Sequence, residues 1–123
     1  MSTNTITNTD AVLHCLTQLL ECSPPLDIDW RERLSALAQM AASQPDTVWH
    51  TLNSKDIWGG AASLANQALN PDTGYDPVLW QFQVRRFREL MIELGELLQA
   101  HGRHYPDIDS WLLAFNNWNR ANV

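Results

Sequence analysis

The sequence predicts an all-α fold, a single-domain bundle of five or six helices. Three observations carry this prediction. Apolar residues recur at helical spacing through most of the 123 residues. No segment shows the alternating apolar pattern of a half-buried strand. Clusters of Pro, Gly, Asn and Asp divide the chain into pieces of ordinary helix length. Because a chain of this length builds one hydrophobic core, residues 10–123 are expected to form one domain.

The N-terminal third is expected to hold a tail and two helices. Residues 1–9 are polar and aperiodic, which favours a loose tail. The first helix then presents five apolar residues on one face and ends before the Pro-Pro pair at 24–25. The second helix is expected to open at Asp29, which forms a capping box with Glu32, and to run to about residue 43.

The middle of the chain contains a glycine pair between two predicted helices. A short third helix is expected to begin at Pro45 and to end before Lys55. A fourth is expected over residues 61–69, directly after Gly59-Gly60. We interpret the pair as a hinge, because glycine adopts backbone angles that other residues avoid and the small side chains after it let two backbones approach closely.

The last two helices are the most clearly marked. Asp76 is a good N-cap and Pro77 a good first residue for the longest helix, which is expected to reach about residue 100. Phe82 and Ile92 depart from its apolar stripe, so we expect them to meet another helix or a partner. The final helix is expected to open at Pro106 and to close the core.

The charge argues against two classes of partner. The formal net charge is −6 and the isoelectric point is near 4.9, whereas nucleic acids and anionic membranes both need a positive surface. Residues 1–76 carry nine acidic and three basic residues, and residues 77–123 carry five of each. We therefore expect the negative field in the first part, where it permits a basic protein as partner.

The absence of a recognisable secretory signal and the spacing of the cysteines favour a cytoplasmic protein. The N-terminus lacks the basic and apolar regions of a secretory signal, and no apolar run approaches the ~18–20 residues that cross a bilayer. Cys15 and Cys22 lie seven positions apart in a predicted helix, about 10.5 Å along its axis. A disulfide needs Cα atoms closer than ~7 Å, so both are expected to be free core thiols.

No motif indicates an enzyme, a cofactor or a metal. The common nucleophile, phosphate-loop, zinc-protease and dinucleotide signatures are absent from the sequence. His101 and His104, with Asp107 and Asp109 nearby, could hold a metal, but a helix ends there and its dipole alone favours histidine. We prefer the helix-end interpretation.

Acidic residues and two tryptophans are the candidate contacts for a protein partner. Several acids of the first part have cap or turn positions, which leaves them free to form a negative rim. Trp58 lies in the hinge and Trp80 at the edge of a helical stripe, and exposed tryptophan often anchors an interface. The residues predicted to bind a partner are Asp27, Asp29, Asp46, Asp56, Trp58, Asp72 and Trp80.

The stretch IWGGAASLANQAL, residues 57–69, resembles the central signature of a family of small bacterial helical proteins. In that signature a Gly-Gly-Met-Gly-Ser-like turn leads into Phe or Leu and then Asn-Asp. The likeness extends at pattern level over about 100 residues. The matching positions are Gly59, Gly60, Ser63 and Leu64, whereas Ala62 stands in place of the later glycine and Ala65-Asn66 in place of Asn-Asp.

This resemblance implies an immunity protein of bacterial competition or toxin–antitoxin systems. Such a companion binds a cognate toxin, which a secretion system can deliver, and occludes its active site. The acidic charge is compatible with a toxin whose active site is basic. We expect a monomer or homodimer without a cofactor, in which residues 59, 60 and 63 form a structural hinge. The alternative is a helical structural or adaptor protein that self-associates or binds a partner helix through Phe82 and Ile92. An enzyme with an unrecognised site near His101 and His104 is the third possibility.

Overall fold

The computed structural model describes residues 3–22, 26–69 and 76–121. Over these ranges it contains six α-helices, one short 3₁₀ helix and no strand, which confirms the predicted all-α bundle. The α-helices are α1 (Thr3–Leu19), α2 (Ile28–Met40), α3 (Pro45–Leu52), α4 (Lys55–Trp58), α5 (Pro77–His101) and α6 (Asp107–Ala121), and the 3₁₀ helix is η1 (Ala65–Leu69).

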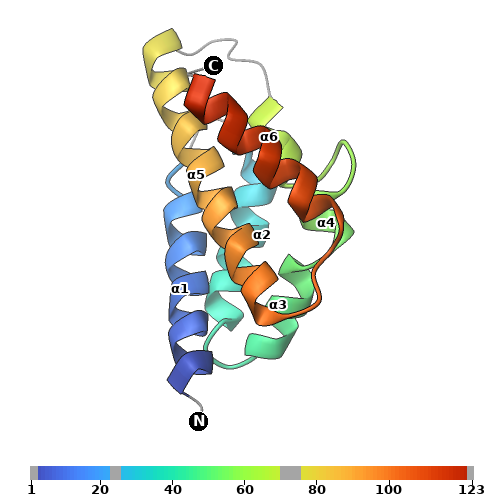
Figure 1. Ribbon diagram of the computed structural model, residues 1–123. Helices are drawn as coiled ribbons and strands as arrows, with labels where there is room; N and C mark the ends of the chain where they lie inside the picture. Colours follow the sequence, from blue (N-terminus) through green and yellow to red (C-terminus); the bar gives the residue numbers. More distant parts are fainter. Residues whose placement is uncertain (1–2, 23–25, 70–75, 122–123) are drawn as a thin grey trace.

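The long helices form the body of the bundle (Figure 1). α1 packs against α2 and α5, and α6 folds back along α5 in the most extensive contact of the molecule. The short elements α3, α4 and η1 form a side layer beside α2 and α6. None of the helices in the described ranges is long and apolar enough to cross a membrane.

The first helix begins earlier than the sequence predicts. α1 starts at Thr3, whereas we expected a loose tail over residues 1–9. Polar residues of low helix propensity suggested the tail. Adding residues to an existing helix is much easier than nucleating one, so an extension in front of a strong amphipathic segment can form without an apolar pattern of its own. The predicted end at Pro24-Pro25 falls outside the described residues.

Capping aspartates start two of the helices. The Asp27 carboxylate accepts a hydrogen bond from the Trp30 backbone N–H at 2.9 Å, so α2 is capped by Asp27 and not, as predicted, by Asp29. Asp29 lies in the first turn, where the helix dipole favours an acid. The prediction for α5 is confirmed, because Asp76 accepts hydrogen bonds from the N–H groups of residues 78 and 79 at 2.8 and 3.1 Å.

One core runs through the bundle. Trp58, Phe87 and Phe115, from α4, α5 and α6, are its largest fully buried side chains. Cys15 and Cys22 are buried and free, as expected. Burial raises the pKa of the Cys15 thiol to about 12 and that of Cys22 to about 11, so both thiols are un-ionised at neutral pH and unreactive.

Candidate functional site

A loop of small residues protrudes from the side of the bundle (Figure 1). We call residues 59–64, between α4 and η1, the glycine loop. Gly60, Ala61 and Ala62 are exposed at its tip, whereas Ser63 and Leu64 are buried at its base. The sequence predicted a helix over residues 61–69, but the chain turns through residue 64 and only η1 follows. That prediction was wrong, and the bonds that hold the loop explain why.

Three indole N–H groups hold the main chain in and before the glycine loop. Trp30 of α2 donates to the carbonyl of Ala62 at 3.2 Å. Trp111 of α6 donates to the carbonyl of Trp58 at 2.7 Å, and Trp58 donates to the carbonyl of Leu52 at 2.9 Å. Each neutral hydrogen bond contributes about 1 kcal/mol, and together they tie the segment to two long helices and to the end of α3.

Side chains within the segment close the turn itself. The Ser63 hydroxyl donates to the carbonyl of Gly60 at 2.9 Å and accepts from the N–H of Asn66 at 3.3 Å. The Asn66 amide donates to the carbonyl of Ala61 at 2.8 Å. Gly60 has a φ of +87°, a conformation that residues with a Cβ rarely adopt. These bonds replace those of a helix, so the alanine-rich sequence forms a fixed turn.

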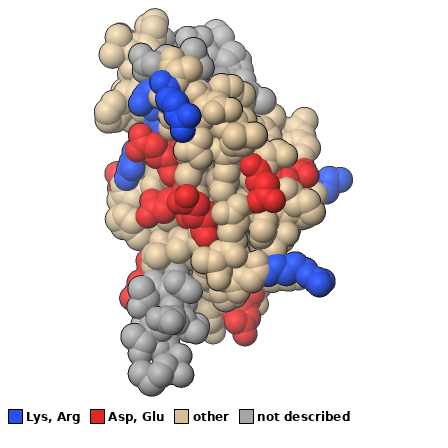
Figure 2. Space-filling model, viewed as in Figure 1, with Lys and Arg blue, Asp and Glu red and all other residues tan. Residues whose placement is uncertain are grey.

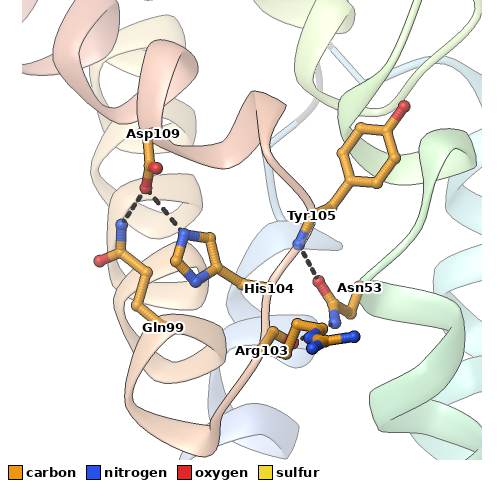
Figure 3. A network of polar contacts seen from close by, with 6 residues as sticks. All are labelled: Asn53, Gln99, Arg103, His104, Tyr105 and Asp109. Carbon is orange, nitrogen blue, oxygen red and sulfur yellow. Dashed lines mark hydrogen bonds and ion pairs between the residues drawn. The ribbon is translucent and has the colours of Figure 1, made fainter.

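The connection between α5 and α6 (Figure 3) contacts Gly59 at the start of the glycine loop. Asn53 accepts from the N–H of Tyr105 at 2.6 Å and donates to the carbonyl of Arg103 at 2.9 Å. The Tyr105 hydroxyl thereby lies against Gly59, where an added Cβ would come within 2.9 Å of it. The space beside Gly59 is therefore filled, and a larger residue there would displace the loop or the tyrosine.

A groove with an apolar floor lies next to the loop. It encloses about 210 Å³ between α2, α3 and α4, and Trp30, Leu37 and Ile57 contribute to its floor. The Arg33 guanidinium lies 4.0 Å from the centre of the Trp30 ring and 3.7 Å from the Asp56 carboxylate. Both charged groups are more than half exposed, so this pairing is weak and exchangeable.

The structure separates the acidic residues predicted to bind a partner. Asp27 and Asp29 flank the start of α2, close to Trp30 and hence to the glycine loop, and Asp56 lies in α4 at the base of the loop. Asp46 follows the other end of α2, about 20 Å away along the helix axis. Asp72 lies outside the described residues. Three of the predicted acids therefore share one region, and Asp46 does not belong to it.

The two predicted tryptophan anchors are not free surface residues. Trp58 is 0% exposed, so the prediction that it contacts a partner was wrong. Its ring belongs to the core, because α4 turns it inward and its N–H finds a buried carbonyl. Trp80 is half-buried against the core. Ile92 also packs on the core, whereas Phe82 is 67% exposed, so these two residues do not form one exposed face.

The two histidines near the end of α5, His101 and His104, contact different residues and do not form one site. His101 stacks on Trp49, with ring centres 3.9 Å apart, and borders a polar cleft of about 220 Å³. His104 contacts Asp109 at 2.9 Å, and Asp109 also accepts from Gln99 (Figure 3). Hydrogen bonds from Gln99 and then His104 lower the pKa of the Asp109 carboxyl. Within the described ranges, no three His, Cys, Asp or Glu side chains come together as a metal site requires.

Negative charge is not confined to the first part of the chain. Figure 2 shows acidic side chains across the middle of the face that α5 and α6 form, with basic side chains toward its margins. Glu89, Glu93 and Glu96 are exposed along α5. Counting charges along the sequence missed this face, because four of the five arginines that balance the count lie in the first half of α5 or at the end of α6.

The sequence did not single out the partners that fix the glycine loop. Trp30 and Trp111 fit the apolar stripes of their helices, which indicates only a place in the core, and Asn53 and Tyr105 carried no local signal. Their bonds join positions 32 to 53 residues apart. Comparisons of the chain with protein-family models, with curated proteins and with solved structures gave no match.

Proposed function

We propose that this chain is a binding protein of the immunity type, which captures a toxin with a basic active site and occludes it. One observation carries the proposal. An exposed loop of small residues lies beside an apolar groove that Asp56 and Arg33 border, and three tryptophan N–H bonds hold the main chain in and before this loop. Enzymatic chemistry receives no comparable support from the residues that the structure describes.

A rigid loop favours binding because little freedom is lost when a partner covers it. The exposed tip, residues 60–62, has no side chain larger than a methyl group, so a partner surface can approach the backbone closely. The loop protrudes from the bundle and is bonded to Trp30 of α2, and the residue before it is bonded to Trp111 of α6.

The groove beside the loop suits a lysine or arginine side chain of the partner. The aliphatic stem of such a side chain would lie on the apolar floor, and its charge would reach Asp56. Arg33 now occupies a comparable position, over the Trp30 ring and beside Asp56. A partner arginine would make the same two contacts after Arg33 moves into solvent. The overall charge of −6 would speed the encounter.

The test uses the tagged full chain as bait in an extract of the source organism, followed by binding measurements with the captured protein. Two double variants carry the same charge change. Asp29→Lys with Asp56→Lys alters the acid that borders the groove and an exposed acid in the nearby first turn of α2, and Asp46→Lys with Glu96→Lys alters exposed acids elsewhere. We expect the first to weaken binding by about 100-fold or more and the second to act only through the weaker long-range field.

Two further variants test the geometry. Arg33→Gln should strengthen binding, because it removes the internal cation that the partner displaces. Ala61→Arg should weaken binding without lowering the melting temperature, since Ala61 is exposed. Equal effects of both double variants would show that only net charge matters. If no basic partner is captured, or if the captured protein retains its activity in the complex, the immunity proposal is wrong.

A further inference from the structure

Exposed apolar side chains gather at the start of α5. Val78, Leu79 and Phe82 are 78%, 46% and 67% exposed, and they are three of the five large hydrophobic residues that the described part of the chain leaves exposed. Their spacings of three and four residues place Phe82 next to both of the others on the helix surface. We call these three residues the α5 ridge.

The α5 ridge lies away from the glycine loop. Figure 1 shows the first turns of α5 extending past the end of α1, on the side of the bundle opposite the loop. Phe82 also borders a small hollow of about 160 Å³ with Glu21 and Cys22 at the end of α1. A ligand on this surface would therefore leave the glycine loop open.

Charges at the two ends of the α5 ridge are opposite. Asp76 is exposed before its first residue, and Arg85 and Arg86 follow its last. Asp76 and Arg86 are ten residues apart, about 15 Å along the helix. Among the described residues, Arg86 makes long contacts to Glu89 at 3.6 Å and to Gln18 at 3.4 Å, which it can exchange. The surface is thus complementary to itself when two copies run antiparallel, and repulsive when they run parallel.

We infer that the α5 ridge binds a second copy of this chain, with the two α5 helices antiparallel. A two-fold axis midway between Leu79 and Phe82 puts Phe82 of each copy beside Leu79 of the other. The same axis brings Asp76 of each copy near Arg86 of the other, whereas Arg85 donates a hydrogen bond to the carbonyl of Asn119 in its own copy at 2.8 Å. Two molecules of net charge −6 repel one another, and this arginine-bearing end of α5 is a place where they can meet with attraction.

The size of the α5 ridge sets the strength of the dimer. Three partly exposed side chains provide well under the ~800 Å² per partner of a standard interface. We therefore expect a dimer that dissociates on dilution, in the micromolar range or weaker. It does not depend on the proposed immunity function, since its test needs only the chain itself.

Sedimentation equilibrium of the full chain from about 5 µM to about 500 µM, the range for a small interface, measures this association. The mean mass should rise from one copy of 14.0 kDa toward two. Phe82→Glu should raise the dissociation constant at least about tenfold. Leu113→Glu is the matched control, because Leu113 is equally exposed, at 65%, on α6. A constant monomer mass, or equal effects of both variants, would overturn the inference.

Two neutralising variants test the orientation. Asp76→Asn keeps a good helix cap, and Arg86→Gln keeps the length of the side chain. Each should weaken an antiparallel dimer by about two- to tenfold, since each removes two attractive pairs. In a parallel dimer both changes would relieve repulsion and strengthen association, which would contradict the antiparallel arrangement.

Discussion

The structure predicts how substitutions at Gly60 of the glycine loop change the free energy of unfolding. This residue has a φ of +87°, and nothing lies within 4 Å of the position that a Cβ would take. A substitution there therefore meets conformational strain and no steric clash. The left-handed conformation costs a residue with a Cβ about 1–2 kcal/mol. Gly60→Ala should lower the free energy of unfolding by about that amount, and Gly60→Val by about 2 kcal/mol or more because branching at Cβ stiffens the residue.

Asparagine separates this explanation from a packing effect. Asn tolerates the left-handed conformation better than Ala although it is larger, so Gly60→Asn should cost less than Gly60→Ala. The assay is thermal and urea unfolding followed by circular dichroism. For a domain of this size, 1 kcal/mol corresponds to roughly 3–6 °C in melting temperature. Unchanged stability of Gly60→Val, or an Asn variant less stable than the Ala variant, would refute the reasoning.

Gly59 provides the contrasting case. A Cβ there would lie 2.8 Å from Cγ of Lys55 and 2.9 Å from the Tyr105 hydroxyl, and its φ is ordinary. Gly59→Ala should therefore destabilise through crowding, and Tyr105→Phe should recover part of the loss by removing one crowded atom. The same Tyr105→Phe change should not rescue Gly60→Ala. A double-mutant cycle measures both couplings.

Three further outcomes follow from the remaining contacts. Trp111→Phe should lower the free energy of unfolding in urea by about 1–3 kcal/mol, because the carbonyl of Trp58 loses the N–H that it accepts at 2.7 Å. Unchanged stability of this variant would show that the bond does not hold the loop. Asp27→Ala should lower the free energy of unfolding by about 1 kcal/mol because α2 loses its cap, whereas Asp29→Ala should lower it by less. A larger loss for Asp29→Ala would instead support Asp29 as the cap, as the sequence predicted. Cys15 and Cys22 should resist a thiol reagent at pH 8 until the protein unfolds. Because burial raises their pKa from 9.0 to about 12 and about 11 in the folded state, their contribution to stability is complete below pH 9 and should be lost as the pH rises from about 9 toward 12; labelling at equal rates in native and unfolded protein would contradict this.

Helix periodicity and capping residues were sufficient for much of the fold. The prediction placed both ends of α3 and α5 and the start of α6 within about two residues, because Pro45, Asp76 and Pro106 mark their starts and their apolar stripes face one core. These signals are local, since caps and stripes lie within or beside the helices that they define. The first turns of α1 carried no such signal, and that boundary was missed.

The glycine loop shows where local reasoning stops. Alanine favours a helix over residues 61–69 when each residue is judged by its neighbours. Against this preference, Gly60 starts a turn, Ser63 binds two backbone groups, and Trp30 binds the Ala62 carbonyl from 32 residues away. Local propensity amounts to a few tenths of a kcal/mol per residue, whereas each of these bonds contributes about 1 kcal/mol, so the turn bonds of Ser63 and the tertiary bond from Trp30 together outweigh the helix preference.

Trp58 shows that local sequence reasoning was also insufficient for predicting a contact residue. Its place beside two glycines suggested an exposed anchor, because glycine-rich segments lie on surfaces. α4 is a single turn, Lys55–Trp58, and it ends with the indole directed into the core, where the carbonyl of Leu52 accepts its N–H. The backbone carbonyl of Trp58 accepts a hydrogen bond from the indole N–H of Trp111. A tryptophan that is bonded at both ends positions the loop after it, so the surface that a partner would meet is the small-residue tip and the groove beside it.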